Sequence, residues 1–112
     1  MITEHAYLYV KPGAEADFEA AFTEASDLMA ASPGFRGLTI SRSIRDEGVY
    51  LLLVRWKALE DHLTGWRESQ AFLEWSLLLH KYYDPFPVVD HFEEFRIVLP
   101  EQAVPWTQPL GG

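Results

Sequence analysis

The segment 53–75 constrains this chain of 112 residues more than any other, because it joins a strand-like run to helical turns and carries three of the four tryptophans of the chain. These are Trp56, Trp66 and Trp75, and His62 lies about one helical turn before the second of them. An indole is a large, rigid apolar surface with a single N–H donor. Several indoles beside a histidine form either a heavy core or a flat pocket for an aromatic molecule.

Composition and charge indicate one folded domain and limit its partners. Hydrophobic residues make up 48% of the chain and aromatic residues 14%, which is typical of a globular protein rather than a disordered one. A chain of this length buries only a modest fraction of its surface, so we expect that it associates with a partner. Its net charge of -8 argues against nucleic-acid partners, since phosphate binding requires concentrated positive charge.

The cysteine count and hydropathy address location and cofactors. The chain has no cysteine, which excludes disulfides and thiolate metal sites. Its longest apolar run, 49–54, is far shorter than the roughly 20 residues of a membrane span, and its start does not resemble a signal peptide. We therefore expect a cytoplasmic protein with no membrane partner. Neither the spacing of the histidines nor any glycine-rich fingerprint predicts a dedicated metal site or a bound nucleotide.

Residue periodicity predicts six main elements. Segment 2–10 alternates between two usable faces, as a strand covered on both sides does. Apolar residues then recur at helical spacing from position 14 until the Ser-Pro-Gly sequence at 32–34 ends the helix. Segments 35–44 and 49–56 predict a hairpin of two strands. Segments 59–66 and 70–82 predict a broken helix whose second half is capped by Ser69, and 88–99 predicts a last strand.

This β-α-β-β-α-β order is the ferredoxin-like arrangement of a four-stranded antiparallel sheet with both helices on one face, an α+β fold. We expect one domain over 1–99, followed by an extended arm over 100–112 that contains Trp106. Two helices cover only one face of such a sheet. Tyr7, Tyr9 and one apolar side of the hairpin would be exposed in a monomer, so we expect a homodimer formed through the open sheet face.

Three sets of residues resemble a known family over about residues 2–98. They are the SPGFRG sequence at 32–37, the YLLLVRW sequence at 50–56, and Trp66 with Ser69, Phe72 and Trp75 in the broken helix. In this order and spacing they resemble the antibiotic biosynthesis monooxygenase (ABM) domain, which belongs to the dimeric α+β barrel proteins. The resemblance implies the fold more specifically than the activity, because one fold hosts many functions.

The resemblance implies two oxygenase chemistries. Some members of the family oxidise reduced polycyclic aromatics without a cofactor, because the substrate carbanion itself reacts with dioxygen. Their pocket carries an Asn, a Trp four residues later and a Tyr six residues further on. This chain has His62, Trp66 and Phe72 at those positions, so it keeps the tryptophan, replaces the amide with an imidazole and lacks the phenol hydroxyl.

Other members of the family cleave haem. They use an Asn on the first strand and an axial His ten residues after the Trp. Here Ala6 or a neighbouring residue stands at the first position and Ser76 at the second, and neither alanine nor serine supplies the side chain that the pattern requires. His80 lies one helical turn beyond Ser76 and is the alternative haem ligand on that helix.

We therefore predict a cofactor-independent monooxygenase that oxidises a small aromatic or quinol substrate with dioxygen. The alternatives are a haem-degrading monooxygenase and a non-catalytic module for ligand binding or dimerisation. Two of the site residues have a structural alternative: Trp66 would then be a core residue, and His62 would be an exposed residue on the surface of the helix. The predicted site has His62 as general base and Trp66 as catalytic residues, with substrate-binding residues Trp56, Phe72, Trp75, His80 and Tyr83.

Three further side chains are predicted to serve structure. Arg42 and Arg55 are expected to form ion pairs with Glu93 or Glu94; the alternative for either is a buried cation that binds an acidic or quinone-like ligand. His91 is expected at the dimer interface.

Overall fold

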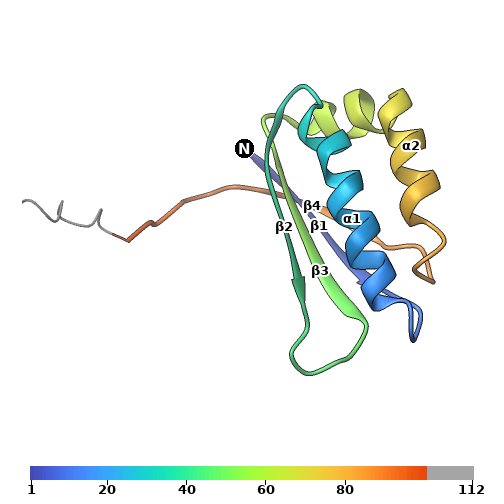
Figure 1. Ribbon diagram of the computed structural model, residues 1–112. Helices are drawn as coiled ribbons and strands as arrows, with labels where there is room; N and C mark the ends of the chain where they lie inside the picture. The colour runs from blue at the N-terminus through green and yellow to red at the C-terminus, as the bar shows by residue number, and fades with distance from the viewer. Residues whose placement is uncertain (101–112) are drawn as a thin grey trace, which may run out of the picture.

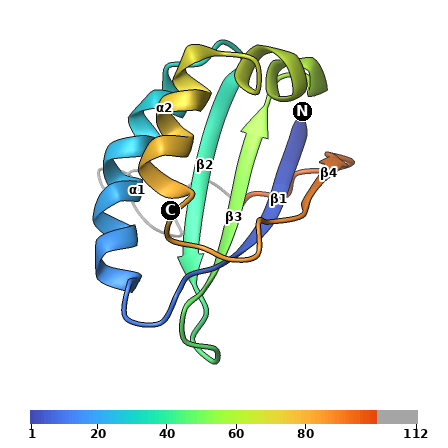
Figure 2. The ribbon, with the colours of Figure 1, turned by 90° about the vertical axis from the view of Figure 1, so that its right-hand side faces the viewer.

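The structure, a computed structural model, describes residues 1–100 and has two layers (Figure 1). One layer is a sheet of β1 (Ile2–Tyr9), β2 (Phe35–Arg42), β3 (Val49–Trp56) and β4 (Val89–Glu93), in the order β2-β3-β1-β4. All of its neighbouring strands pair antiparallel. The helices α1 (Glu15–Ala30) and α2 (Gln70–Leu79) cover the same face of this sheet (Figure 2). The predicted ferredoxin-like fold is confirmed.

The broken helix between β3 and β4 is also confirmed, and its first half is unusual. Residues Asp61–Trp66 form a π-helix, η1, in which the Arg67 N–H donates a hydrogen bond of 3.0 Å to the carbonyl of His62. The wider turn buries both His62 and Trp66. Helix α2 then begins after Ser69, whose hydroxyl accepts a hydrogen bond of 3.1 Å from the Phe72 N–H, as the predicted cap requires. Such π-helical turns occur frequently at functional sites.

The predicted ends of several elements were too long. Strand β4 ends at Glu93 rather than at residue 99, because its only partner, β1, begins at Ile2, which pairs with Glu93. A last backbone hydrogen bond joins the Glu94 N–H to the Met1 carbonyl at 3.0 Å. Strand β2 ends at residue 42 and α2 at residue 79. Apart from Pro100, the predicted arm over 100–112 lies outside the described residues.

The core lies between the helices and the inner face of the sheet. Ala6 and Leu8 on β1, and Val10 just after it, point inward and are buried, whereas Tyr7 and Tyr9 point to the other face and are each 46% exposed. The predicted division of β1 into two faces is therefore confirmed. None of the helices within residues 1–100 is long and apolar enough to cross a membrane.

Candidate functional site

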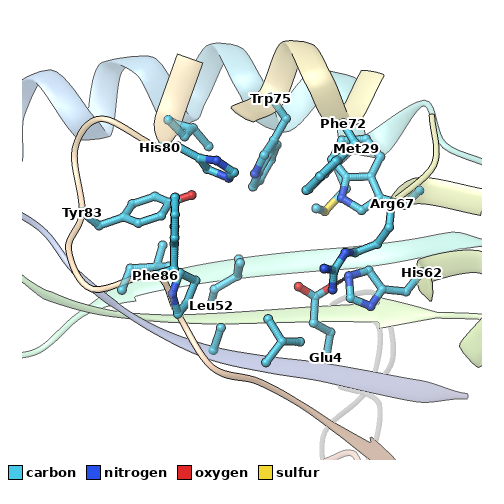
Figure 3. Close-up of a pocket in the computed structure, with 16 residues that line it drawn as sticks. Glu4, Met29, Leu52, His62, Arg67, Phe72, Trp75, His80, Tyr83 and Phe86 are labelled. Atoms are coloured by element: carbon cyan, nitrogen blue, oxygen red, sulfur yellow. Dashed lines mark ion pairs between the residues drawn. The ribbon is translucent and has the colours of Figure 1, made fainter. Parts of the chain in front are cut away.

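A cavity of about 350 Å³ opens between the inner face of the sheet and the broken helix (Figure 3). This volume is at the lower end of the range for sites that bind small molecules. One end is polar and the other aromatic, and apolar side chains of the sheet lie between them. The lining residues are Glu4, Ala6, Leu8, Met29, Leu52, His62, Trp66, Arg67, Phe72, Trp75, Leu79, His80, Tyr83, Phe86, Pro87 and Val89.

Glu4 provides a buried carboxylate at the polar end. It lies on the inward face of β1, two residues before Ala6, and is only 4% exposed. Its Oε1 accepts a hydrogen bond of 2.9 Å from Trp56 Nε1 and lies 3.2 Å from His62 Nε2. Burial raises the pKa of Glu4, and the Trp56 hydrogen bond and the positive charge of Arg67 offset part of that rise. The carboxylate therefore has a raised affinity for a proton.

His62 lies between Glu4 and a second histidine. It is 2% exposed, its ring stacks on Trp56 with 5.6 Å between centroids, and its Nδ1 lies 2.8 Å from His91 Nε2. Burial lowers the pKa of His62 to about 4, and repulsion from His91 and Arg67 adds to the effect. The imidazole is therefore neutral at neutral pH. A neutral imidazole beside a carboxylate of raised pKa has the properties of a general-base site.

Arg67 is the one permanent positive charge among the residues that line this cavity. Figure 3 shows its guanidinium group above the Glu4 carboxylate and beside the His62 ring. The side chain follows η1 directly, and its guanidinium lies 5.9 Å from the centroid of the Phe72 ring. A cation in this position stabilises negative charge that develops on a bound molecule near Glu4.

Aromatic rings line the cavity from its middle to the end opposite Glu4. The Trp66 ring meets those of Trp75 and Phe72 edge to face, with centroids 5.5 and 5.8 Å away. At the far end, His80 contacts Tyr83 and Phe86 at 5.7 and 5.1 Å. Burial lowers the pKa of His80 and raises that of Tyr83, so that both are neutral at neutral pH. Walls of this kind suit a flat aromatic ligand.

The structure brings together six of the seven predicted site residues. His62, Trp66, Phe72, Trp75, His80 and Tyr83 line the cavity. Trp56 does not, because it is fully buried behind Glu4. The alternative of a surface His62 was wrong. Trp66 fits both of its interpretations, since it is 1% exposed and also lines the cavity.

The sequence interpretation missed Glu4 and Arg67 and did not place His91 beside His62. Strand alternation could have identified Glu4, because Glu4 lies two residues before Ala6 and therefore points to the same inner face of the sheet. His91 pairs with Glu4 in the register of β1 and β4 and contacts His62 on the inner side. It thus faces the helical layer rather than the open sheet face through which the dimer is predicted to form.

One of the two predicted ion pairs is confirmed. Arg55 Nε lies 2.6 Å from Glu94 Oε1, as expected. Arg42 pairs instead with Glu19 of α1, at 2.8 Å.

The side chains at this site do not match the haem-cleaving pattern. His80, the alternative ligand, packs against the rings of Phe72, Tyr83 and Phe86, with centroids within 6.2 Å. Ser76, at the axial position of the haem-cleaving pattern, does not line the cavity. Within residues 1–100, no group of three histidine, aspartate or glutamate side chains is placed to hold a metal ion.

Comparisons with known proteins identify the family. Residues 1–76 match the family model described as antibiotic biosynthesis monooxygenase. The chain is 42% identical over 94 residues to the uncharacterized protein YczJ of Bacillus subtilis, covering 84% of this chain and 99% of YczJ. A solved structure from Bordetella bronchiseptica that bears the family's name is 35% identical, covers 83% of this chain and 95% of its own, and has a TM-score of 0.79.

A more distant neighbour shares the fold. SnoaB of Streptomyces nogalater, described as a cofactor-independent oxygenase, is 24% identical, covers 89% of this chain and 97% of its own, and has a TM-score of 0.75. From the family model and the Bacillus relative, we conclude that the chain belongs to the antibiotic biosynthesis monooxygenase family.

Proposed function

We propose that this protein is a cofactor-independent monooxygenase that oxidises a small anthrone-type or quinol-type substrate with dioxygen. The observation that carries the proposal is the buried Glu4–His62 pair at the polar end of an aromatic cavity. Membership of a monooxygenase family supports it, and so does the description of SnoaB, a protein of the same fold, as a cofactor-independent oxygenase.

The substrate ring lies against Trp66 and Phe72, with its acidic C–H or O–H group toward Glu4. Both ring nitrogens of His62 already have polar neighbours, so Glu4 rather than His62 takes the proton directly. His62 assists by sharing that proton, and Arg67 stabilises the oxyanion of the resulting anion.

An anthrone anion then reduces dioxygen by one electron, and the radical pair combines to form a peroxide. Protonation of the peroxide and loss of water leave a carbonyl where the CH₂ group was. One dioxygen thus supplies one oxygen atom to the product and one to water, and the electrons come from the substrate alone.

Dioxygen consumption tests this reaction. Wild-type protein in buffer with a chelator is given 9-anthrone and 1,4-naphthoquinol, and uptake above the uncatalysed rate is expected. Glu4→Gln removes the base and is expected to lower turnover by roughly 100- to 10,000-fold. The matched control is Glu19→Gln, the same substitution at an outer carboxylate that does not line this cavity. Probes that quench tryptophan fluorescence without being oxidised would instead indicate a binding module.

We also propose that the protein is a homodimer through the open sheet face. Tyr7, Tyr9 and Phe92 are 46%, 46% and 55% exposed there. On β1, which carries Tyr7 and Tyr9, the buried Nδ1 of His5 has no hydrogen-bond partner within the described residues. Sedimentation at low micromolar concentration should give twice the 12.9 kDa mass of the chain. A monomer at that concentration would contradict the proposal.

A further inference from the structure

We propose that His62 and His91 form a proton relay that connects the buried Glu4 carboxylate to solvent at the edge of the sheet. As a part of catalysis, the relay rests on the oxygenase function proposed above. Its existence as a proton path is a property of the three side chains alone, and can be measured without a substrate.

The three groups form a continuous row. Glu4 Oε1 lies 3.2 Å from His62 Nε2, and His62 Nδ1 lies 2.8 Å from His91 Nε2. A neutral imidazole has one N–H donor and one acceptor nitrogen, so it can receive a proton on one side while it releases one on the other. The second distance is short for N–H···N and indicates a direct hydrogen bond between the two rings.

The row leads from the interior to the surface. Glu4 and His62 are 4% and 2% exposed, whereas His91 is only partly buried. His91 lies on β4, the outer strand of the sheet, directly across from Glu4 in the β1–β4 register. Strand pairing therefore places the outlet beside the base, with His62 of η1 bridging the two from the helical layer.

The other groups at this end of the cavity offer no equivalent path. Strand β3 contributes only the Trp56 indole N–H, which is already donated to Glu4. Arg67 follows η1 and carries a charge that it does not give up near neutral pH. Among these neighbours, only the two histidines can gain and lose a proton.

The relay accounts for the proton that the substrate releases in the proposed reaction. The relay starts from the tautomer of His62 that carries its proton on Nδ1 and donates it to His91 Nε2, so that Nε2 is unprotonated. Glu4 takes the substrate proton and passes it to His62 Nε2 while the proton on His62 Nδ1 moves to His91 Nε2, which leaves an imidazolium at the edge of the sheet. When the substrate anion has combined with dioxygen, the peroxide recovers a proton by the reverse movement. This return restores the original tautomer of His62, so the relay is ready for the next turnover.

Nitrogen NMR of ¹⁵N-histidine-labelled protein tests the path directly. We expect a scalar coupling across the hydrogen bond between His62 Nδ1 and His91 Nε2. In His91→Gln, an amide can keep a hydrogen bond to His62 but has no labelled ring nitrogen, so the coupling should disappear, which assigns it to this pair of rings. Absence of the coupling in the wild-type protein would overturn the relay.

Chemical rescue tests the relay during turnover. His91→Ala is expected to lower dioxygen uptake by roughly tenfold to 100-fold, less than loss of the base itself, and added imidazole should restore it. Asp90→Asn, on the same strand but the opposite face, is the matched control and should show neither effect. A folded His91→Ala protein that keeps full activity, or that imidazole does not rescue, would contradict a role in turnover. If wild-type protein oxidises neither probe, the proposed function fails, and the NMR result still decides the relay.

Discussion

Two glutamates, Glu4 and Glu19, make the same kind of contact in different surroundings. Each accepts a hydrogen bond from an inward aromatic residue of β3: Glu4 from Trp56 at 2.9 Å, and Glu19 from Tyr50 at 2.6 Å. The Glu4 side chain is 6% exposed and that of Glu19 is 37% exposed. The pKa of Glu4 is raised by burial, whereas that of Glu19 is lowered by the Tyr50 and Arg42 hydrogen bonds.

This difference shows that an aromatic donor does not by itself determine what a carboxylate can do. Arg42 binds both oxygens of Glu19, at 2.8 and 3.2 Å, so that carboxylate is fully ionised and ties α1 to β2 and β3. Glu4 has no such direct cation and faces a cavity. Burial without a bound cation leaves a group that gains a proton readily, which suits a base. Exposure with a bound cation leaves a structural link.

The largest effect is expected for the pH dependence of stability that His62, the neighbour of Glu4, confers. Its pKa is about 4 in the folded protein against 6.5 as the ordinary value, so the unfolded chain binds more protons between these pH values. The free energy of unfolding should therefore fall as pH is lowered from 6.5 to 4, by roughly 3 kcal/mol from this group. His62→Gln should lose that part of the pH dependence.

Urea unfolding at pH 7 and pH 4 measures this difference. Glu4 acts in the opposite direction, because an acid with a raised pKa favours the folded state most when it is protonated. Glu4→Gln should therefore steepen the loss of stability in acid. Glu19→Gln should make the loss shallower, since the lowered pKa of Glu19 stabilises the fold above its ordinary pKa. If the free energy of unfolding changed by the same amount between pH 7 and pH 4 in all these variants, the two glutamates would not differ in their effect on stability.

The next largest effect comes from removing the aromatic donors. Trp56→Phe leaves the buried Glu4 carboxylate without its N–H partner and should lower the free energy of unfolding by about 1–3 kcal/mol, in addition to any loss of packing. Tyr50→Phe should cost less, because water can replace the hydroxyl at the exposed Glu19. Thermal unfolding of both variants measures the two costs. Equal costs would show that burial does not distinguish these hydrogen bonds.

Much of the molecule could be predicted from its sequence because the information is local. Alternation on β1, the helical spacing from position 14 and the Ser69 cap each depend on neighbouring residues, and together they determine the order of the elements. The end of β4 could not be predicted in this way, because it depends on where β1 begins. Strand length at the edge of a sheet is set by the partner strand.

The candidate site likewise has one part that the sequence predicts and one part that only the fold reveals. The aromatic wall comes from one continuous segment, so His62, Trp66, Phe72 and Trp75 could be found together. The polar end requires three strands and η1 to meet: Glu4 from β1, Trp56 from β3 and His91 from β4 surround His62. That convergence is a property of the strand order β2-β3-β1-β4, which places β1 between β3 and β4.

The smallest effect concerns the arginines near the two glutamates. Arg42→Ala should raise the pKa of Glu19 only part of the way toward 4.5, because the Tyr50 hydrogen bond is the larger cause of its lowering. Arg67→Ala should raise the pKa of Glu4 further above its ordinary value, since the guanidinium now opposes the effect of burial. Carbon NMR of the two carboxyl groups across pH gives both changes. If Glu19 returned fully to its ordinary pKa in Arg42→Ala, its aromatic partner would have no electrostatic role, and only the Trp56–Glu4 contact would remain as a hydrogen bond that tunes a carboxylate.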